Sequence, residues 1–166
     1  MASWSDFAAA EPTLAAGIRA LLQQYGPGLA YLATVRPDGA PRLHPVSPVF
    51  TDQGLYCFIV PSPKRRDLER DGRYALHSFP PEENDDEAIL TGRATPVHNP
   101  RVTARLAADL HASPEVDWRL FELSIESATL RTHGPAGALP LAAGPLVAPL
   151  TRSWRAELPR PLAAVS

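Results

Sequence analysis

Residues 29–50 read LAYLATVRPDGAPRLHPVSPVF, and this stretch indicates the fold. Its first part, residues 29–35, has apolar side chains on both faces of the predicted strand. Such a run is typical of a strand that is buried on both sides. The Arg-Pro-Asp-Gly sequence at 36–39 predicts a turn, because proline fixes φ, aspartate can bond its own backbone and glycine tolerates positive φ. We therefore predict that residues 41–50 return as a neighbouring strand.

Three prolines lie in this returning strand. Pro41 and Pro45 have the same parity, so their missing N–H donors face the same side, whereas Pro48 has the opposite parity. Proline cannot donate to a strand ladder and is confined to edges and bulges. We expect a bulge or a break in pairing at Pro48, and an edge that is partly unpaired.

Strand and helix patterns alternate along the rest of the chain. Further strands are predicted over residues 55–60, 73–79, 88–97 and 119–130, and Gly92 marks a point where the backbone bends or approaches another segment closely. Helices are predicted over 12–25, 62–71 and 99–112, with Ser62 and Asn99 as N-caps. The expected fold class is mainly β with peripheral helices, a small antiparallel barrel of five or six strands.

The composition limits the class of protein. The 166 residues are 45% apolar and 20% charged, which is typical of one folded domain, and the net charge of −2 argues against a nucleic-acid binder. The single cysteine, Cys57, excludes an internal disulfide and a thiolate metal site. We find no apolar run long enough to span a membrane and no export signal at the N-terminus, so we expect a cytoplasmic protein.

The regular pattern ends after Gly134. Residues 135–166 contain six prolines and many alanines without a stable period. We predict a folded domain over 1–134 and a C-terminal extension over 135–166, which either runs along a surface or is poorly ordered.

The junction between the strand at 55–60 and the following helix is the first candidate site. A helix N-terminus presents free N–H groups, and here it carries the Ser62 hydroxyl and the cations Lys64 and Arg65. Lys64 is the only lysine in the chain. This set suits a phosphate, although an ordinary capped helix with solvated charges has the same pattern. Arg70, at the far end of this helix, is expected to face solvent.

Arg42 and His44 are the second candidate. At positions i and i+2 of a strand they project from the same face. If this strand pairs with the one before Ser62, both side chains meet Lys64 around one anion; the alternatives are a surface ion pair and a structural histidine. The other histidines, at 77, 98, 111 and 133, have no metal-ligand spacing, so no metal site is predicted.

Three ordered segments, LATVRPDGAPRLHPV at 32–46, GLYCFI at 54–59 and SPKRRDL at 62–68, together resemble the flavin-binding split-barrel family, which includes the pyridoxamine 5′-phosphate oxidases and flavin- or F420-dependent reductases. The resemblance implies a six-stranded split barrel that forms a homodimer with FMN, or alternatively F420, between the subunits. It places Arg42 and Lys64 at the cofactor phosphate with Ser62 and Arg65 beside them. It places Leu43, His44, Val46 and Ser47 along the flavin ring, and the backbone of Phe58 and Ile59 at its pyrimidine edge.

Three functions are compatible with these observations. The first is a flavin-dependent oxidoreductase acting on a small molecule, in which hydride chemistry belongs to the cofactor, so we name no catalytic acid or base. The second is a non-catalytic carrier or sensor of the same fold that holds flavin or haem. The third is a structural or interaction domain with an empty groove.

Overall fold

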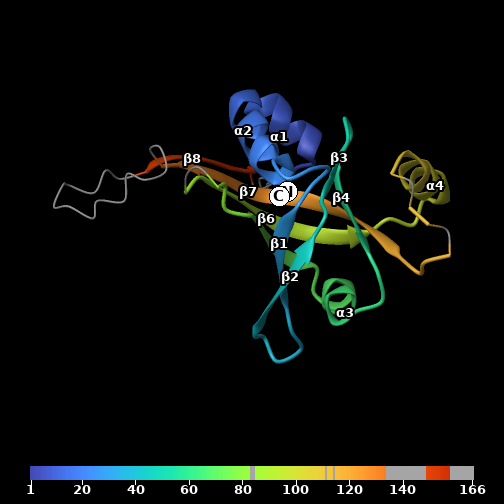
Figure 1. The fold of residues 1–166 in the computed structure, drawn as a ribbon. Coiled ribbons are helices and arrows are strands. Elements are labelled where there is room, and N and C mark those ends of the chain that lie inside the picture. The colour runs from blue at the N-terminus through green and yellow to red at the C-terminus, as the bar shows by residue number, and fades with distance from the viewer. Residues whose placement is uncertain (83–84, 111, 114, 134–148, 158–166) are drawn as a thin grey trace, which may run out of the picture.

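The computed structural model describes residues 1–82, 85–110, 112–113, 115–133 and 149–157. In these residues a single antiparallel sheet is flanked by short helices (Figure 1). The elements are α1 (Trp4–Ala10), α2 (Pro12–Gln23), β1 (Ala30–Val35), β2 (Pro41–Val46), β3 (Val49–Phe50), β4 (Leu55–Ile59), α3 (Pro63–Arg70), β5 (Arg73–Ser78), β6 (Glu87–Pro96), α4 (Pro100–Asp109), β7 (Arg119–Thr132) and β8 (Leu150–Arg155).

The segment at 41–50 lies at both ends of the sheet. The strand order is β2-β1-β5-β6-β7-β4-β3, so β2 pairs with β1 at one end and β3 pairs with β4 at the other. The chain changes partner at Ser47 and Pro48, which belong to neither strand. The predicted break at Pro48 is therefore confirmed, and it curls the antiparallel sheet into a split barrel.

The inner face of this curled sheet carries the core. Alternate residues of neighbouring strands point inward and are fully buried, as Leu32, Leu76 and Leu90 illustrate, since they lie in register across β1, β5 and β6. Helices α1 and α2 pack against β6 and β7 (Figure 1) and add Phe7 and Ile18 to this core. The result is one main apolar cluster, with a smaller second cluster formed by Tyr56, Leu106 and Leu120 beside α4.

Gly92 allows β6 to approach β7. The register between the two strands shifts between Thr91 and Gly92, and a Cβ atom on Gly92 would lie 1.8 Å from the carbonyl oxygen of Ser124. The close approach predicted for this glycine is confirmed.

The structure differs from the prediction in three elements. Helix α1 was not predicted; it begins at Ser3, whose side chain accepts a hydrogen bond from the Asp6 N–H in a capping box. Within the described residues the sheet has eight strands instead of six, because two-residue β3 continues the segment after Pro48 and β8 pairs with β7. Strand β8 lies within the predicted extension at 135–166, so this part of the extension is an ordered strand.

Strand β8 is held to the domain by side-chain packing as well as by pairing. The Trp154 ring lies 4.9 Å from the Phe7 ring of α1, centroid to centroid. Residues 134–148 and 158–166 of the extension lie outside the described residues. Among the helices that the structure describes, none is long and apolar enough to cross a membrane.

Candidate functional site

Helix α3 begins as predicted, at a serine cap. Ser62 has extended backbone angles, and its Oγ accepts from the Arg65 N–H at 3.4 Å and donates to the Val60 carbonyl at 2.9 Å. Pro63 occupies the first helical position, where its missing N–H costs nothing. This local geometry orients the first turn of α3 and with it Lys64.

The side chain of Lys64 extends from α3 to the edge strand β2. Its Nζ donates to the Pro45 carbonyl oxygen at 3.2 Å. Partial burial lowers the pKa of Lys64 from its ordinary value. The strand before α3, β4, pairs with β3 and not with β2, so side-chain contacts and not strand pairing join α3 to β2.

Arg42 is held by a buried carboxylate of α3. Its Nε donates to Asp67 Oδ2 at 2.8 Å, and Thr34 Oγ1 of β1 donates to the same oxygen at 3.0 Å. Burial acts to raise the pKa of Asp67, but hydrogen bonds from Arg42 and Thr34, with the charges of Arg42 and Arg70, outweigh it and hold that pKa below its ordinary value. The carboxylate is therefore ionised at neutral pH and pairs with Arg42.

Arg70 is exposed, as predicted, but its side chain also turns back toward Asp67. Its guanidinium lies 3.6 Å from Asp67 Oδ1 and donates to the Val35 carbonyl. The helix is short, so its last turn still faces β1. Arg66, which lines the same pocket as Arg42 and Arg70, is exposed and forms no ion pair with any described residue.

His44 lies beside these charges. Burial, followed by the positive charges of Lys64 and Arg42, lowers the pKa of its imidazole, which favours the neutral form. Its Nε2 is buried and has no hydrogen-bond partner among the described residues. The structure thus brings Arg42, His44 and Lys64 together, and one polar atom of this group lacks a partner.

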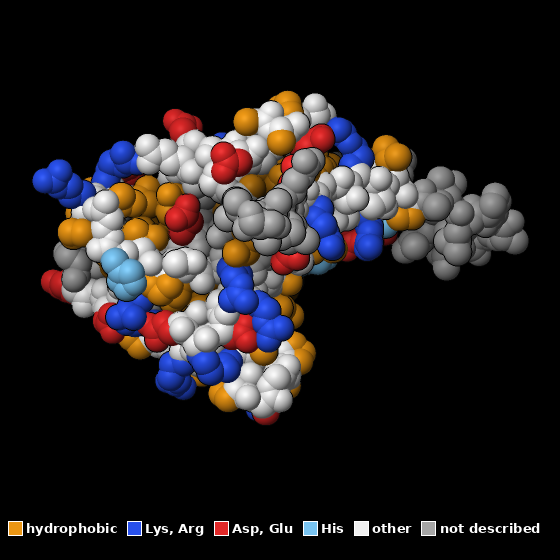
Figure 2. Space-filling view, turned by 180° about the vertical axis from the view of Figure 1, so that it is seen from behind, with side chains coloured by type: hydrophobic (Ala, Val, Ile, Leu, Met, Phe, Trp, Pro, Cys, Tyr) orange, Lys and Arg blue, Asp and Glu red, His pale blue; other side chains and the backbone are white. Residues whose placement is uncertain are grey.

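The remaining predicted residues lie elsewhere in the site or face away from it. Arg65 is turned toward Asp117 and Glu69, at 3.2 and 3.4 Å, so acidic side chains already neutralise its charge. Leu43 is exposed and has the opposite parity to Arg42 and His44 on β2, and Ser47 is exposed at the break after β2. Val46 and Ile59 are buried and Phe58 is half-buried. Figure 2 shows basic and acidic side chains interspersed low on the face seen from behind, at the level of α3 in Figure 1.

Two pockets lie along the segments that carry these residues. One of about 400 Å³ lies at the break between β2 and β3, with Ser47, Pro48 and Phe58 in its wall. The other, of about 220 Å³, is lined by Arg42, Arg66, Asp67 and Arg70 with Pro37 and Pro63. Three cations face one carboxylate there, so the pocket carries a positive charge.

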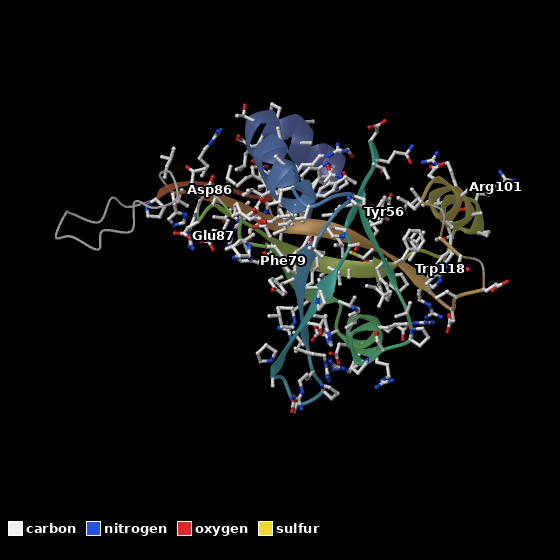
Figure 3. The ribbon with its side chains drawn as sticks, in the orientation of Figure 1. Tyr56, Phe79, Asp86, Glu87, Arg101 and Trp118 are labelled. Atoms are coloured by element: carbon white, nitrogen blue, oxygen red, sulfur yellow. The ribbon has the colours of Figure 1, made fainter. Side chains whose placement is uncertain are left out.

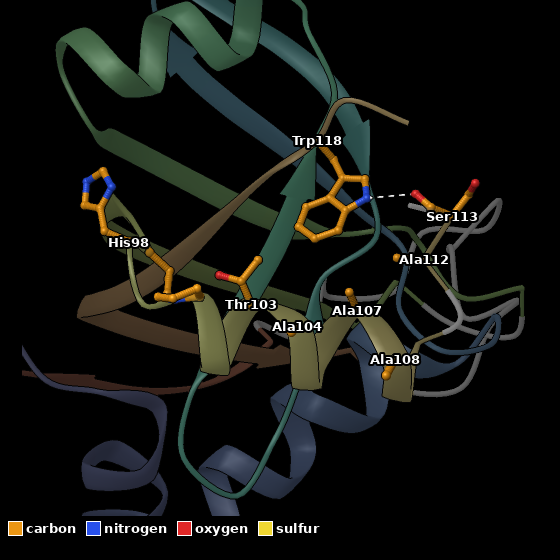
Figure 4. A pocket seen from close by; sticks show the side chains of 10 residues that line it. His98, Thr103, Ala104, Ala107, Ala108, Ala112, Ser113 and Trp118 are labelled. Atoms are coloured by element: carbon orange, nitrogen blue, oxygen red, sulfur yellow. Dashed lines mark hydrogen bonds between the residues drawn. The ribbon is translucent and has the colours of Figure 1, made fainter. Parts of the chain in front are cut away.

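A larger pocket of about 890 Å³ lies beside α4 (Figure 4). The Trp118 indole forms one wall; its Nε1 donates to the Ser113 carbonyl at 3.1 Å, and its ring packs edge-to-face on Phe58 with centroids 4.7 Å apart. Figure 3 places Trp118 beside α4, far from Asp86 and Glu87 at the other end of the sheet. The described residues that line the pocket include no Asp, Glu, Lys or Arg: Val97, His98, Pro100, Thr103, Ala104, Ala107, Ala108, Ala112, Ser113 and Trp118.

Asp67 and Thr34 were not among the predicted site residues. A signal for Asp67 was present, because it follows Lys64 by three positions on α3 and precedes the buried Leu68, so it shares their side of the helix. No sequence signal distinguished Thr34 from the other residues of β1. No cluster of His, Cys, Asp or Glu that could hold a metal ion occurs in the part of the chain that the structure describes.

Solved structures share this architecture. A haem-binding protein from Mycobacterium smegmatis is 17% identical with a TM-score of 0.59 over 84% of this chain and 57% of its own, so this chain spans little more than half of its length. The haem storage protein HutZ from Vibrio cholerae is 19% identical with a TM-score of 0.55, over 76% of this chain and 96% of its own. An F420 reductase is 19% identical with a TM-score of 0.50, over 64% of this chain and 90% of its own.

At these identities the likeness establishes the fold and not the ligand. No curated protein matches the chain. Residues 14–134, which contain β1 to β7 and the whole β2–α3 site, match the family described as pyridoxamine 5′-phosphate oxidase. The chain is therefore a member of the pyridoxamine 5′-phosphate oxidase family of split barrels.

Proposed function

We propose that this protein binds FMN at the group formed by Arg42, His44 and Lys64 and acts as a flavin-dependent oxidoreductase on a small molecule. F420, which also combines a flat tricyclic ring with a phosphate, is the alternative cofactor. The observation that carries the proposal is the meeting of two cations and an unpartnered buried imidazole nitrogen from two segments, β2 and α3.

The chemistry of these side chains fits such a cofactor. Arg42 and Lys64 supply the positive charge that a phosphate requires, and His44 Nε2 needs a polar partner that none of the described residues provides. Arg65 is committed to Asp117 and Glu69, so we assign the phosphate to Arg42 and Lys64 and leave Arg65 outside its contact. When bound, the flavin supplies the hydride chemistry; the protein's residues bind and orient it.

We place the small-molecule substrate in the pocket beside α4. Trp118 contacts Phe58, which the family resemblance puts at the flavin edge, so this pocket adjoins the proposed ring position. Its volume of about 890 Å³ is within the usual range for ligand sites, and its described lining includes no Asp, Glu, Lys or Arg. An uncharged, largely apolar substrate fits this lining better than a phosphorylated one.

We also propose that two copies of the chain associate through the outer face of β1, β2 and β5. Leu43 is 63% exposed there and lies in register beside Ala33, which in turn lies beside Ala75. A contiguous apolar sheet face is typical of an interface. Light scattering should give the mass of a dimer for the natural sequence and of a monomer for Leu43→Glu; a natural monomer would contradict the proposal.

A haem-binding carrier is the second candidate, and His44 is the observation that favours it. The neutral imidazole, which the lowered pKa of His44 favours, is the form that ligates iron. Added haemin should then give a Soret band that is shifted in His44→Ala.

Titration of the purified protein with FMN separates these candidates. Quenching of flavin fluorescence at micromolar protein, followed by reduction with NAD(P)H and reoxidation on a substrate panel, supports the oxidoreductase. A haemin complex without flavin binding supports the carrier. Absence of both complexes refutes the cofactor site and favours an interaction domain.

A further inference from the structure

Asp67 is an unusual residue for helix α3. The neighbouring Arg66, Glu69 and Arg70 are exposed, but Asp67 is only 3% exposed. A buried carboxylate is costly unless it is paired and hydrogen-bonded. Its position therefore requires donors, and the structure supplies them from two strands.

The donors tie Asp67 to both β1 and β2. Thr34, itself 2% exposed, donates its hydroxyl to Oδ2 from β1, and Arg42 donates Nε to the same oxygen from β2. Thr34 and Arg42 are direct partners in the β1–β2 register. The carboxylate is thus fixed by a rigid strand on one side and holds the arginine on the other.

The contact engages only one part of the Arg42 guanidinium. Neither terminal nitrogen of Arg42 forms a hydrogen bond with another described residue, and the side chain remains 28% exposed at the positively charged pocket beside α3. Terminal guanidinium nitrogens can bind an oxyanion through two parallel hydrogen bonds, provided that the group is held in a fixed orientation.

We propose that Asp67 is a positioning residue, which binds Arg42 through Nε so that the terminal nitrogens are presented to the cofactor phosphate. This inference rests on the proposed function. It adds a residue that acts through Arg42 and does not itself touch the ligand. Thr34 has the same role one step further away, because it orients the carboxylate.

If Asp67 and Arg42 formed only a structural ion pair, replacement of Asp67 would change phosphate affinity in the opposite direction. Asp67 places a negative charge beside an anion site, so its removal should strengthen phosphate binding if charge alone matters. Positioning predicts weaker binding despite the gain in positive charge. The direction of the change in affinity therefore distinguishes the two roles.

The experiment measures the affinity of FMN and of riboflavin, which lacks the phosphate, for Asp67→Asn. The matched control is Asp71→Asn, which removes the same charge at the end of the same helix, where the hydrogen bonds go to Arg73. We expect FMN affinity to fall about tenfold in Asp67→Asn, with riboflavin affinity unchanged and no decrease in Asp71→Asn. In a variant that already carries Arg42→Ala, the addition of Asp67→Asn should cause no further loss of FMN affinity, because the two residues act as one unit.

Thr34→Val keeps the experiment decisive if Asp67→Asn does not fold. It retains the ion pair and the side-chain shape, and we expect a smaller loss of FMN affinity in the same direction. Equal or stronger FMN binding by these variants, equal losses for FMN and riboflavin, or additive losses in the double variant would overturn the inference and leave the cofactor site intact. Failure of the natural sequence to bind FMN would instead refute the proposed function together with this inference.

Discussion

Substitution of Lys64 by methionine tests the proposed phosphate contact most directly. Methionine retains an unbranched stem of similar length and removes only the charge and the donors. Lys64 Nζ donates to the Pro45 carbonyl at 3.2 Å, so the substitution also frees one carbonyl at a sheet edge that water can reach. We therefore expect a small effect on folding and a larger one on FMN binding.

The size of the effect follows from the contacts of Lys64. A hydrogen bond between charged groups contributes about 1.5–3 kcal/mol, which corresponds to a factor of about 10 to 100 in affinity. The Lys64 side chain is half-buried, and the Pro45 carbonyl already engages one of the three donors of its ammonium group, so only part of this donor set faces a phosphate. Both features place the expected loss of FMN affinity near the lower end of this range, at about tenfold. Riboflavin affinity should not change.

The assay is a fluorescence titration at fixed ionic strength, because salt screens charge contacts. Arg101→Met is the matched control: Arg101 lies on α4, and its side chain forms no hydrogen bond or ion pair with the described residues. It is a better control than Arg70, which contacts Asp67. If Lys64→Met and Arg101→Met bind FMN equally well, the contact between Lys64 and the phosphate does not exist.

The architecture could be predicted from the sequence because its decisive signals are local. The turn at 36–39 and the parity change at Pro48 specify a hairpin followed by a break, and the structure has both. Strand β8 could not be predicted, since it has no alternating pattern and forms through backbone pairing with β7 and the contact of Trp154 with Phe7. Helix α1 had only the capping signal at Ser3. Tertiary packing decides such segments.

The candidate site was predictable only in part, because tertiary packing also decides which charged side chains pair. The proximity of Lys64 and Arg42 was predicted from pairing between their strands, whereas the structure achieves it through side-chain contacts between α3 and β2. The partners of the charged residues could not be predicted, because each guanidinium has several acidic side chains within its sequence neighbourhood. Arg65 pairs with Asp117, 52 residues away, and Arg42 with Asp67. Only the folded geometry selects these pairs, and they decide which cations remain available to a ligand.

Two further substitutions test the fold away from the site. Gly92→Ala should destabilise the protein by about 3 kcal/mol in urea unfolding, because its Cβ would lie 1.8 Å from the Ser124 carbonyl oxygen. Gly39→Ala is the control: its Cβ would meet no atom within 4 Å, so it should cost only about 1 kcal/mol, for its positive φ. Glu87 is the acidic partner of Arg131 and His77, and these contacts, the Arg131 hydrogen bond first, hold the pKa of its carboxyl below the ordinary 4.5. A lowered carboxyl pKa stabilises the folded state above the unfolded-state pKa, and this contribution is lost as the pH falls through the folded-state value. Since Glu87 is 25% exposed, Glu87→Gln should cost about 1 kcal/mol at pH 7 and progressively less as the pH is lowered below 4.5. A cost that stays constant or grows on acidification would show that the carboxylate is not stabilised by Arg131.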